Sequence, residues 1–262
     1  MSAMRRPNLR LVTGPTLQDR LPLSVSATKI LVAIFAYNEG VRIEATVERV
    51  LDAVPYDVLL VDDGSTDGSI DALRQRPITV LSNWRNRGLG AAMKQAFSHA
   101  LTHGYHLLVS MAGNNQDNPV QIPRLLKPIL EDGYDFVQGS RFLPGGHHGK
   151  MPRYRLVATR CYARLISHAT GKSVTEGTNG FRAFKTGLLR DPRIDWHQAW
   201  LDTYELEPYL LYKTLVLGYR HLEVPVTKIY PRQMLGYTQM KAMTNWWYCL
   251  RPVFFLFLRI KR

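Results

Sequence analysis

Short apolar runs alternate with stretches of helical periodicity from Lys29 onward. Each run of four to eight apolar residues predicts a strand, and recurrence every three to four residues predicts an amphipathic helix. The predicted strands cover 29–35, 58–61, 78–81, 106–111 and 136–138, and the predicted helices cover 41–51, 70–75, 90–103 and 121–131. Strands and helices that take turns are typical of a mostly parallel sheet with helices on both faces. The expected fold class is therefore α/β.

The two ends of the chain differ in character from this core. Residues 1–28 carry four arginines without an apolar run of signal-peptide length, and we interpret them as a mobile basic tail. Residues 29–228 are the predicted catalytic domain. In 229–262, an aromatic and apolar run is broken by Arg251 and Pro252, so it is shorter than the roughly 20 residues that cross a bilayer. This pattern predicts an amphipathic segment lying on an anionic membrane surface, or a core helix with a basic end.

Composition narrows the classes of partner. The chain has 262 residues, of which 45% are hydrophobic, which is enough for one domain with a core. Its formal net charge of +13 favours anionic partners such as phosphates, nucleic acids or anionic lipids. Aromatic and basic residues do not interleave as in RNA-binding strands, so we expect no nucleic-acid partner. The two cysteines, Cys161 and Cys249, form no metal-binding or disulfide pattern and fit a cytoplasmic location.

Polar residues follow two of the predicted strands where each strand ends. Asp62 and Asp63 follow the second strand, and Ala36, Tyr37 and Glu39 stand at the end of the first. Open α/β sheets bind ligands at the carboxyl ends of their strands, and carboxylates accept hydrogen bonds from a nucleobase or from ribose hydroxyls. The alternative interpretation is that these carboxylates only cap turns and helices.

A glycine-containing stretch, 83–94, opens the helix predicted after the third strand. Gly88 and Gly90 precede small residues there. Glycines let a backbone approach a ligand closely, and a helix N-terminus offers free N–H groups to an anion. A tight turn with close packing of the helix on the sheet would require the same residues.

Together these motifs resemble those of the inverting glycosyltransferases of family two, which have the GT-A fold, and more closely the dolichyl- or polyprenyl-phosphate sugar synthases. The resemblance covers about 29–241. It implies transfer of a sugar from a nucleoside-diphosphate sugar to a polyprenyl phosphate, with inversion, by a peripheral protein on the inner face of the cytoplasmic membrane. In that family the positions matching Glu39 and Asp63 contact the nucleotide, and Asp62 supports the turn. Further candidate substrate-binding residues are Ala36, Tyr37, Gly88, Gly113, Asn114 and Gln116.

The sequence departs from the family after the strand 106–111. Relatives have Asp-x-Asp there, whose carboxylates hold a divalent cation, whereas this chain has Ala112, Gly113 and Asn114. Alanine offers no ligand, and an asparagine carbonyl is a poor ligand for a hard cation. Dependence on Mg²⁺ or Mn²⁺ is therefore open. Asn114, Gln116 and Asp117, which is also a catalytic candidate, could form a weaker metal site, or basic residues could neutralise the diphosphate directly.

Arginines further along match the acceptor side of the family. In the sugar synthases, the arginine of a Gly-Ser-Arg motif and a second arginine beyond a glycine-rich loop approach the acceptor phosphate. Arg141 matches the first, and either Arg153 or Arg155 matches the second. The planar guanidinium pairs bidentately with phosphate, although isolated arginines also occur as solvated surface charge. Arg232 and Lys241 resemble basic residues of a loop near the nucleotide diphosphate.

The expected role of one carboxylate depends on whether the acceptor is a hydroxyl or a phosphate. Relatives that act on hydroxyl acceptors use a carboxylate near the position of Glu205 as general base. A phosphate acceptor is already anionic near neutral pH, so Glu205 or Glu207 could instead orient a sugar hydroxyl, or only carry charge at a helix start. The alternative functions are therefore a hydroxyl-directed transferase with Glu205 as base and a non-catalytic nucleotide-sugar-binding protein. The sugar, the nucleoside and the oligomeric state do not follow from the sequence.

Overall fold

The computed structural model of the protein describes residues 28–228, 244–258, 260 and 261. The strands in these residues are β1 (Ile30–Ala36), β2 (Asp57–Asp62), β3 (Thr79–Ser82), β4 (Leu107–Ala112), β5 (Phe136–Ser140), β6 (Arg182–Lys185) and β7 (His221–Pro225). The α-helices are α1 (Val41–Ala53), α2 (Leu89–Thr102), α3 (Ile122–Asp132), α4 (Arg153–Thr170), α5 (Leu206–Val216) and α6 (Thr244–Phe257). The predicted basic tail and the residues Arg232 and Lys241 lie outside this part of the chain.

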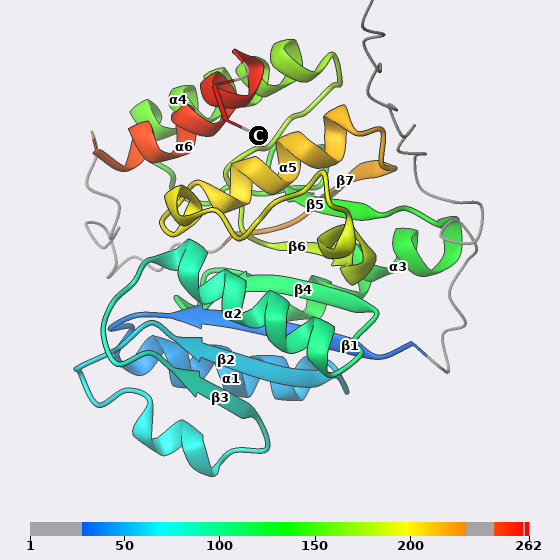
Figure 1. Ribbon diagram of the computed structural model, residues 1–262. Coiled ribbons are helices and arrows are strands. Elements are labelled where there is room, and N and C mark those ends of the chain that lie inside the picture. The colour runs from blue at the N-terminus through cyan, green and yellow to red at the C-terminus, as the bar shows by residue number, and fades with distance from the viewer. Residues whose placement is uncertain (1–27, 229–243, 259, 262) are drawn as a thin grey trace, which may run out of the picture.

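The strands of the described residues form one sheet in the order β3-β2-β1-β4-β6-β5-β7. Neighbouring strands are parallel except at β6, which runs antiparallel to β4 and to β5. Strands β1, β2 and β3 therefore end on the same side, as Figure 1 shows. The expected mostly parallel α/β sheet is confirmed. In such sheets, ligands bind at the carboxyl ends of the strands.

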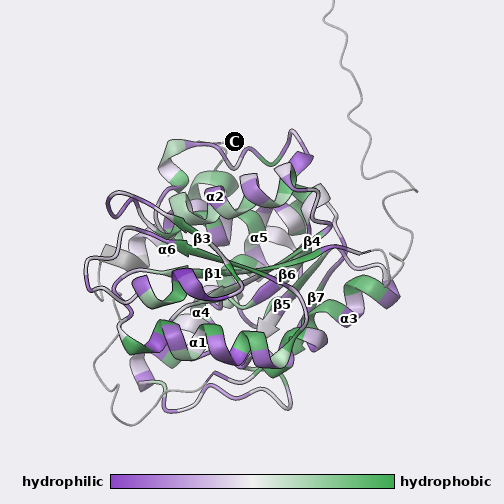
Figure 2. Cartoon of the chain, turned by 90° about the horizontal axis from the view of Figure 1, so that it is seen from below, coloured by the Kyte–Doolittle hydropathy of each residue, from purple (hydrophilic) through white to green (hydrophobic). Residues whose placement is uncertain are grey.

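Helices cover both faces of the sheet because alternate side chains of each strand point to opposite faces. Leu31 and Ala33 face a core shared with α2, α4, α5 and α6, whereas Val32 and Ile34 face a core shared with α1 and α3. Figure 2 shows the strongly apolar strands between these layers. Burial on both faces explains why the strands appear in the sequence as continuous apolar runs.

Several elements differ from the expectation, and the longest is the helix α4, which was not predicted. The helix predicted at 70–75 is a 3₁₀ helix, Asp71–Gln75, which is a common form for a segment of about one turn. Strand β6 was not predicted, because its four residues include Arg182 and follow Gly180. Its position between β4 and β5 places Arg182 opposite Ser110 and Gln138.

Helix α6 packs with one side on the rest of the described structure. Val253 and Leu256 are 1% and 8% exposed and belong to the core that α2, α4 and α5 share. The hydroxyl of Tyr162 on α4 donates to the carbonyl of Cys249 at 2.8 Å, and Arg251 forms an ion pair with the fully buried Glu205. The C-terminal helix therefore completes the main core, and in this respect the core-helix alternative applies.

The other side of α6 is apolar and exposed. Trp247, Phe254 and Phe257 are 53%, 41% and 54% exposed. Figure 1 shows α6 alongside α4, which exposes Tyr154 and Val157. Within the described residues, no helix is both long and apolar enough to span a membrane.

Candidate active site

The turn after β2 is tied to the end of β1. Asp62 accepts a hydrogen bond from the Ser65 amide at 2.9 Å, which is the turn-supporting role expected for it. The Asn38 side chain accepts one from the Thr66 amide at 2.8 Å, and the Asn38 amide donates to the Ser65 hydroxyl at 2.9 Å. Asn38 has a positive φ of 50°, which asparagine tolerates better than most residues. These bonds hold the two strand ends in a fixed relation.

Asp63 is buried at this edge and accepts three hydrogen bonds. Its Oδ1 accepts from the side chain of Asn83 at 2.8 Å and from the Arg87 amide at 3.0 Å, and its Oδ2 accepts from the Gly88 amide at 2.7 Å. A carboxylate has about four acceptor positions, so most of its capacity holds the 83–88 loop against β2. The predicted contact of Asp63 with a nucleotide would use the remaining position and the loop that it shapes.

Glu39 lies close by on the loop after β1. Its carboxylate forms a 2.8 Å ion pair with Arg42 and is 13% exposed. Burial raises the pKa of this carboxyl above its ordinary value, and the charge of Arg42 offsets part of that effect. Ala36 is buried and Tyr37 is half-buried at the same strand end. The structure therefore brings the predicted donor-side residues of β1 and β2 together.

Three backbone amides at the start of α2 are already hydrogen-bonded within the protein. The Gly88 amide donates to Asp63, the Gly90 amide to the Thr203 carbonyl at 2.7 Å, and the Ala91 amide to the Asp202 carbonyl at 2.9 Å. A Cβ at Gly90 would lie 1.9 Å from the carbonyl oxygen of Leu201. These three amides are therefore not available to an anion, and close packing explains the glycines. A contact between Gly88 and the donor stays a prediction.

Neighbouring residues pack closely around the glycine at the Asp-x-Asp position. A Cβ at Gly113 would lie 2.7 Å from the Ile43 side chain and 3.0 Å from the Phe35 carbonyl, so a larger residue there would require these neighbours to shift. Asn114 accepts a hydrogen bond from the Gln116 amide at 3.2 Å, which closes a local turn. Ala112, at the first position of this motif, has only a methyl group as its side chain.

The donor set here does not fit a divalent cation. Asp117 is 2% exposed, and its carboxylate accepts from the Ala112 amide at 3.3 Å and lies 3.1 Å from Nζ of Lys228. An ammonium group therefore already neutralises the carboxylate of the suggested weaker site. In the part of the chain that the structure describes, no group of three histidine, cysteine or acidic residues is placed to hold a metal.

Arg141 lies just beyond β5 in a buried ion pair. Its Nε contacts Glu176 Oε2 at 2.6 Å, and its Nη2 donates to the hydroxyl of Thr178 at 3.0 Å. Arg141 and Glu176 are 4% and 0% exposed. Sequence reasoning did not single out Glu176. The signal available in the sequence was an acidic residue two positions before Thr178.

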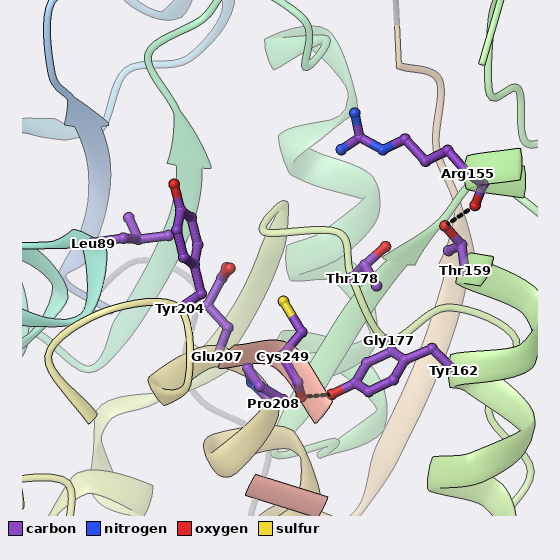
Figure 3. A pocket seen from close by; sticks show the side chains of 10 residues that line it. All are labelled: Leu89, Arg155, Thr159, Tyr162, Gly177, Thr178, Tyr204, Glu207, Pro208 and Cys249. Carbon is purple, nitrogen blue, oxygen red and sulfur yellow. Dashed lines mark hydrogen bonds between the residues drawn. The ribbon is translucent and has the colours of Figure 1, made fainter. Parts of the chain in front are cut away.

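Beside this ion pair lies a mostly apolar pocket between α2, α4, α5 and α6. It is lined by Leu89, Arg155, Thr159, Tyr162, Gly177, Thr178, Tyr204, Glu207, Pro208 and Cys249. Figure 3 shows the Arg155 side chain reaching from α4 towards the side of the pocket that Leu89 and Tyr204 form. Thr178 connects Arg141 to the pocket. Its hydroxyl accepts a hydrogen bond from Arg141, and it lines the pocket together with Arg155. Arg153 is exposed and does not line the pocket, so the geometry favours Arg155 as the second arginine.

Glu205 and Glu207 stand at the start of α5 in different environments. Glu205 is fully buried, accepts from the Thr203 hydroxyl and pairs with Arg251. Glu207 lines the pocket and lies 3.4 Å from the buried guanidinium of Arg182. Glu207 therefore faces the pocket, whereas Glu205 connects α5 to α6. A role for Glu205 as general base stays a prediction.

Comparison with known proteins gives two kinds of match. A sequence profile described as glycosyl transferase family 2 matches residues 31–191. The undecaprenyl-phosphate mannosyltransferase of Micrococcus luteus is 34% identical over 82% of this chain and 88% of its own length. The polyprenol monophosphomannose synthase of Mycolicibacterium smegmatis is 31% identical over 84% of each chain.

Solved structures share the fold at lower identity. Glucosyl-3-phosphoglycerate synthase from Mycobacterium tuberculosis, crystallised with Mn²⁺, UDP-glucose and phosphoglyceric acid, superposes with a TM-score of 0.61 at 20% identity. The match covers 87% of this chain and 80% of that protein. This likeness supports the architecture alone.

Proposed function

Because the chain belongs to glycosyl transferase family 2, we propose that it transfers a sugar from a nucleoside-diphosphate sugar to a polyprenyl phosphate, with inversion. It is a glycosyltransferase with the GT-A type of α/β fold. The observation that carries the acceptor assignment is that Arg141 donates to Thr178, and Thr178 lines a mostly apolar pocket together with Arg155. Arginine side chains can bind a phosphate, and an apolar pocket can accommodate an isoprenoid chain.

The donor binds at the carboxyl ends of β1 and β2. Glu39 and the turn at Asp63 lie there with acceptor oxygens suited to a base and ribose. The burial of Asp63 together with its loop pre-organises this edge, so little reordering is required when the nucleotide binds.

The acceptor binds where α4, α5 and α6 meet. The guanidinium groups of Arg141 and Arg155 orient the phosphate, and aromatic and aliphatic side chains of the pocket contact the first part of the lipid. The names of the two relatives, an undecaprenyl-phosphate mannosyltransferase and a polyprenol monophosphomannose synthase, support this class of acceptor.

The reaction is a single in-line displacement. An ionised phosphate oxygen attacks the anomeric carbon, the glycosidic C–O bond to the diphosphate breaks, and the nucleoside diphosphate leaves with the electron pair. The attacking oxygen carries no proton, so no general base is required. The protein contributes positioning of the two substrates and positive charge near the departing diphosphate.

A pair of acceptors that differ only in the phosphate tests this assignment. With radiolabelled GDP-mannose and UDP-glucose as donors, we expect transfer to undecaprenyl phosphate to exceed transfer to undecaprenol by more than about a hundredfold, since a neutral alcohol cannot accept the charge-assisted hydrogen bonds that guanidinium groups donate to a phosphate. Transfer to the alcohol that depends on Glu205 would instead support the hydroxyl-directed alternative. Binding of nucleotide without transfer to either lipid would support a binding protein.

We propose that α4 and α6 together contact an anionic membrane. Both expose apolar side chains on neighbouring helices, and Arg153, Arg160, Arg164 and Lys261 are exposed on the same two segments. Apolar insertion combined with basic residues is how interfacial helices bind anionic lipid. The surface is next to the pocket, so a lipid-linked phosphate could reach the pocket while its tail remains in the bilayer.

Serine substitutions at the three exposed aromatic residues of α6 test this surface. The variant Trp247→Ser/Phe254→Ser/Phe257→Ser should bind vesicles containing anionic phosphatidylglycerol about tenfold more weakly, because it loses the apolar area that inserts. Flotation with liposomes measures the bound fraction. Val120→Ser, at a residue that is 72% exposed at the start of the α3 segment, is the control and should float as the wild type does. Equal flotation of the triple variant and the wild type would contradict the assignment.

A further inference from the structure

A lysine occupies the place next to β4 where the family's metal motif would act. Lys228 follows β7 in sequence and is 8% exposed. Its Nζ lies 3.1 Å from Asp117 Oδ1 and 3.4 Å from Asn179 Oδ1. Asp117 in turn accepts from the amide of Ala112, the residue at the first Asp-x-Asp position. The ammonium is therefore connected to the carboxyl end of β4 through one carboxylate.

We propose that Lys228 supplies the positive charge that binds the donor diphosphate, so that the donor binds without a divalent cation. This inference rests on the proposed use of a nucleoside-diphosphate donor. It assigns to the chain's own ammonium group the electrostatic role that a metal ion would have between Asp-x-Asp and the diphosphate.

The charge balance supports this assignment. A divalent cation and the two carboxylates that hold it are neutral as a group, and the cation presents positive charge to the donor. Lys228 and Asp117 are likewise neutral as a pair, and Ala112 and Asn114 have lost the two charges that would require a metal. Adding a cation to the existing pair would place it next to an ammonium, which the Coulomb energy opposes.

The donor capacity of the ammonium also supports it. A lysine ammonium has three N–H donors. In the described residues two acceptors face it, the side chains of Asp117 and Asn179, so one donor remains for a ligand. Because the side chain is largely removed from water, its charge is screened less than that of a surface lysine.

The backbone holds Lys228 in this position. Its amide donates to the His147 carbonyl at 2.9 Å, and it forms an isolated antiparallel bridge with Asp117. Asn179 is itself fixed, because its side chain donates to the Gly139 carbonyl at 2.9 Å. The ammonium is therefore pre-organised at the sheet edge, which lowers the entropic cost of using it to bind a phosphate.

Calorimetric titration of UDP, UMP, GDP and GMP into the full chain tests the proposal. In EDTA, we expect one diphosphate to bind more tightly than its monophosphate, and 5 mM Mg²⁺ should change that affinity by less than about threefold. Lys228→Met should weaken the diphosphate about tenfold or more and the monophosphate less than about twofold, because only the distal phosphate loses a charged hydrogen bond. A merely structural lysine would not discriminate between the two ligands.

Two further variants separate charge from folding. Lys228→Met leaves Asp117 buried without its partner, so the double variant Lys228→Met/Asp117→Asn removes both charges together. The double variant should show the same loss of diphosphate preference. Lys185→Met is the matched control, because Lys185 forms a similar 3.0 Å ion pair with Asp135 at the opposite edge of the sheet. It should bind both nucleotides as the wild type does.

The outcomes distinguish this inference from the proposed function. Diphosphate binding that requires Mg²⁺, or that survives in both Lys228 variants, overturns the inference and leaves the glycosyltransferase assignment intact. Absence of binding by UDP and GDP in either buffer overturns the proposed donor class, and the role of Lys228 with it.

Discussion

Replacing Arg141 with lysine is expected to lower the kcat/KM of transfer to undecaprenyl phosphate by about a hundredfold or more. Lysine keeps the charge opposite Glu176, but its single ammonium cannot contact Glu176, Thr178 and a phosphate with the fixed geometry of a guanidinium. Loss of one positioned donor to a reacting oxyanion has effects of this size. Initial rates at varied acceptor concentration measure the change.

The truncating variant Arg141→Ala should behave differently. It leaves the fully buried carboxylate of Glu176 without its cation, so the free energy of unfolding should fall by about 3–5 kcal/mol. Chemical denaturation of this variant and of Arg141→Met/Glu176→Gln, in which both charges are removed, separates the stability effect from the catalytic one.

Donor binding and a distant arginine serve as controls for Arg141. Nucleotide-induced stabilisation should be unchanged in Arg141→Lys, because the donor site at β1 and β2 is intact. Arg193→Lys alters another short arginine–carboxylate pair, with Asp191 at 2.6 Å, after β6 at the far edge of the sheet. It should transfer sugar at the wild-type rate. A kcat/KM within threefold of wild type for Arg141→Lys would remove Arg141 from the acceptor site.

Replacing Asp63 with alanine is expected to abolish stabilisation by the nucleotide and to weaken the fold at the same time. Three hydrogen bonds from the 83–88 loop lose their acceptor, and at about 1 kcal/mol each the free energy of unfolding should fall by about 3 kcal/mol. A ligand present at a hundred times its Kd stabilises the wild type by about 2.7 kcal/mol. Denaturation with and without the diphosphate that binds measures both quantities.

Asp57→Ala is the matched control on the same strand. Asp57 stands at the other end of β2 and accepts from the hydroxyl of Tyr105 at 2.8 Å. Its loss should reduce stability while the ligand-induced gain of about 2.7 kcal/mol persists. If Asp63→Ala folds and keeps that gain, the β2 turn is not the nucleotide site.

Short-range patterns predicted correctly which strand ends lie next to each other. The strand ends at Ala36 and Asp62 are adjacent in the sheet, in the register Ala36↔Asp62, as parallel pairing of consecutive βαβ units requires. The turn-supporting role of Asp62 depends on residues three positions apart, so it was accessible from sequence.

Long-range partners were not accessible in this way. Glu176 is 35 residues from Arg141, and Lys228 reaches Asp117 only because the chain beyond β7 returns to the loop after β4. The amides at the start of α2 are bonded to carbonyls of Asp202 and Thr203, more than a hundred residues later. A sequence pattern shows that such groups are polar but not which group neutralises them.

The double-sided character of α6 limits how the protein can be divided for experiments. Residues 31–191, where the family profile matches, end before β7, α5 and α6, which complete the sheet and one of its two cores. A recombinant fragment that stops before Thr244 would expose the core residues against which Val253 packs. It would also leave the buried Glu205 without its ion-pair partner Arg251. The proposed membrane contact and the cooperative unfolding of the core thus both depend on this helix, and only substitutions on its outer side can change the first without the second.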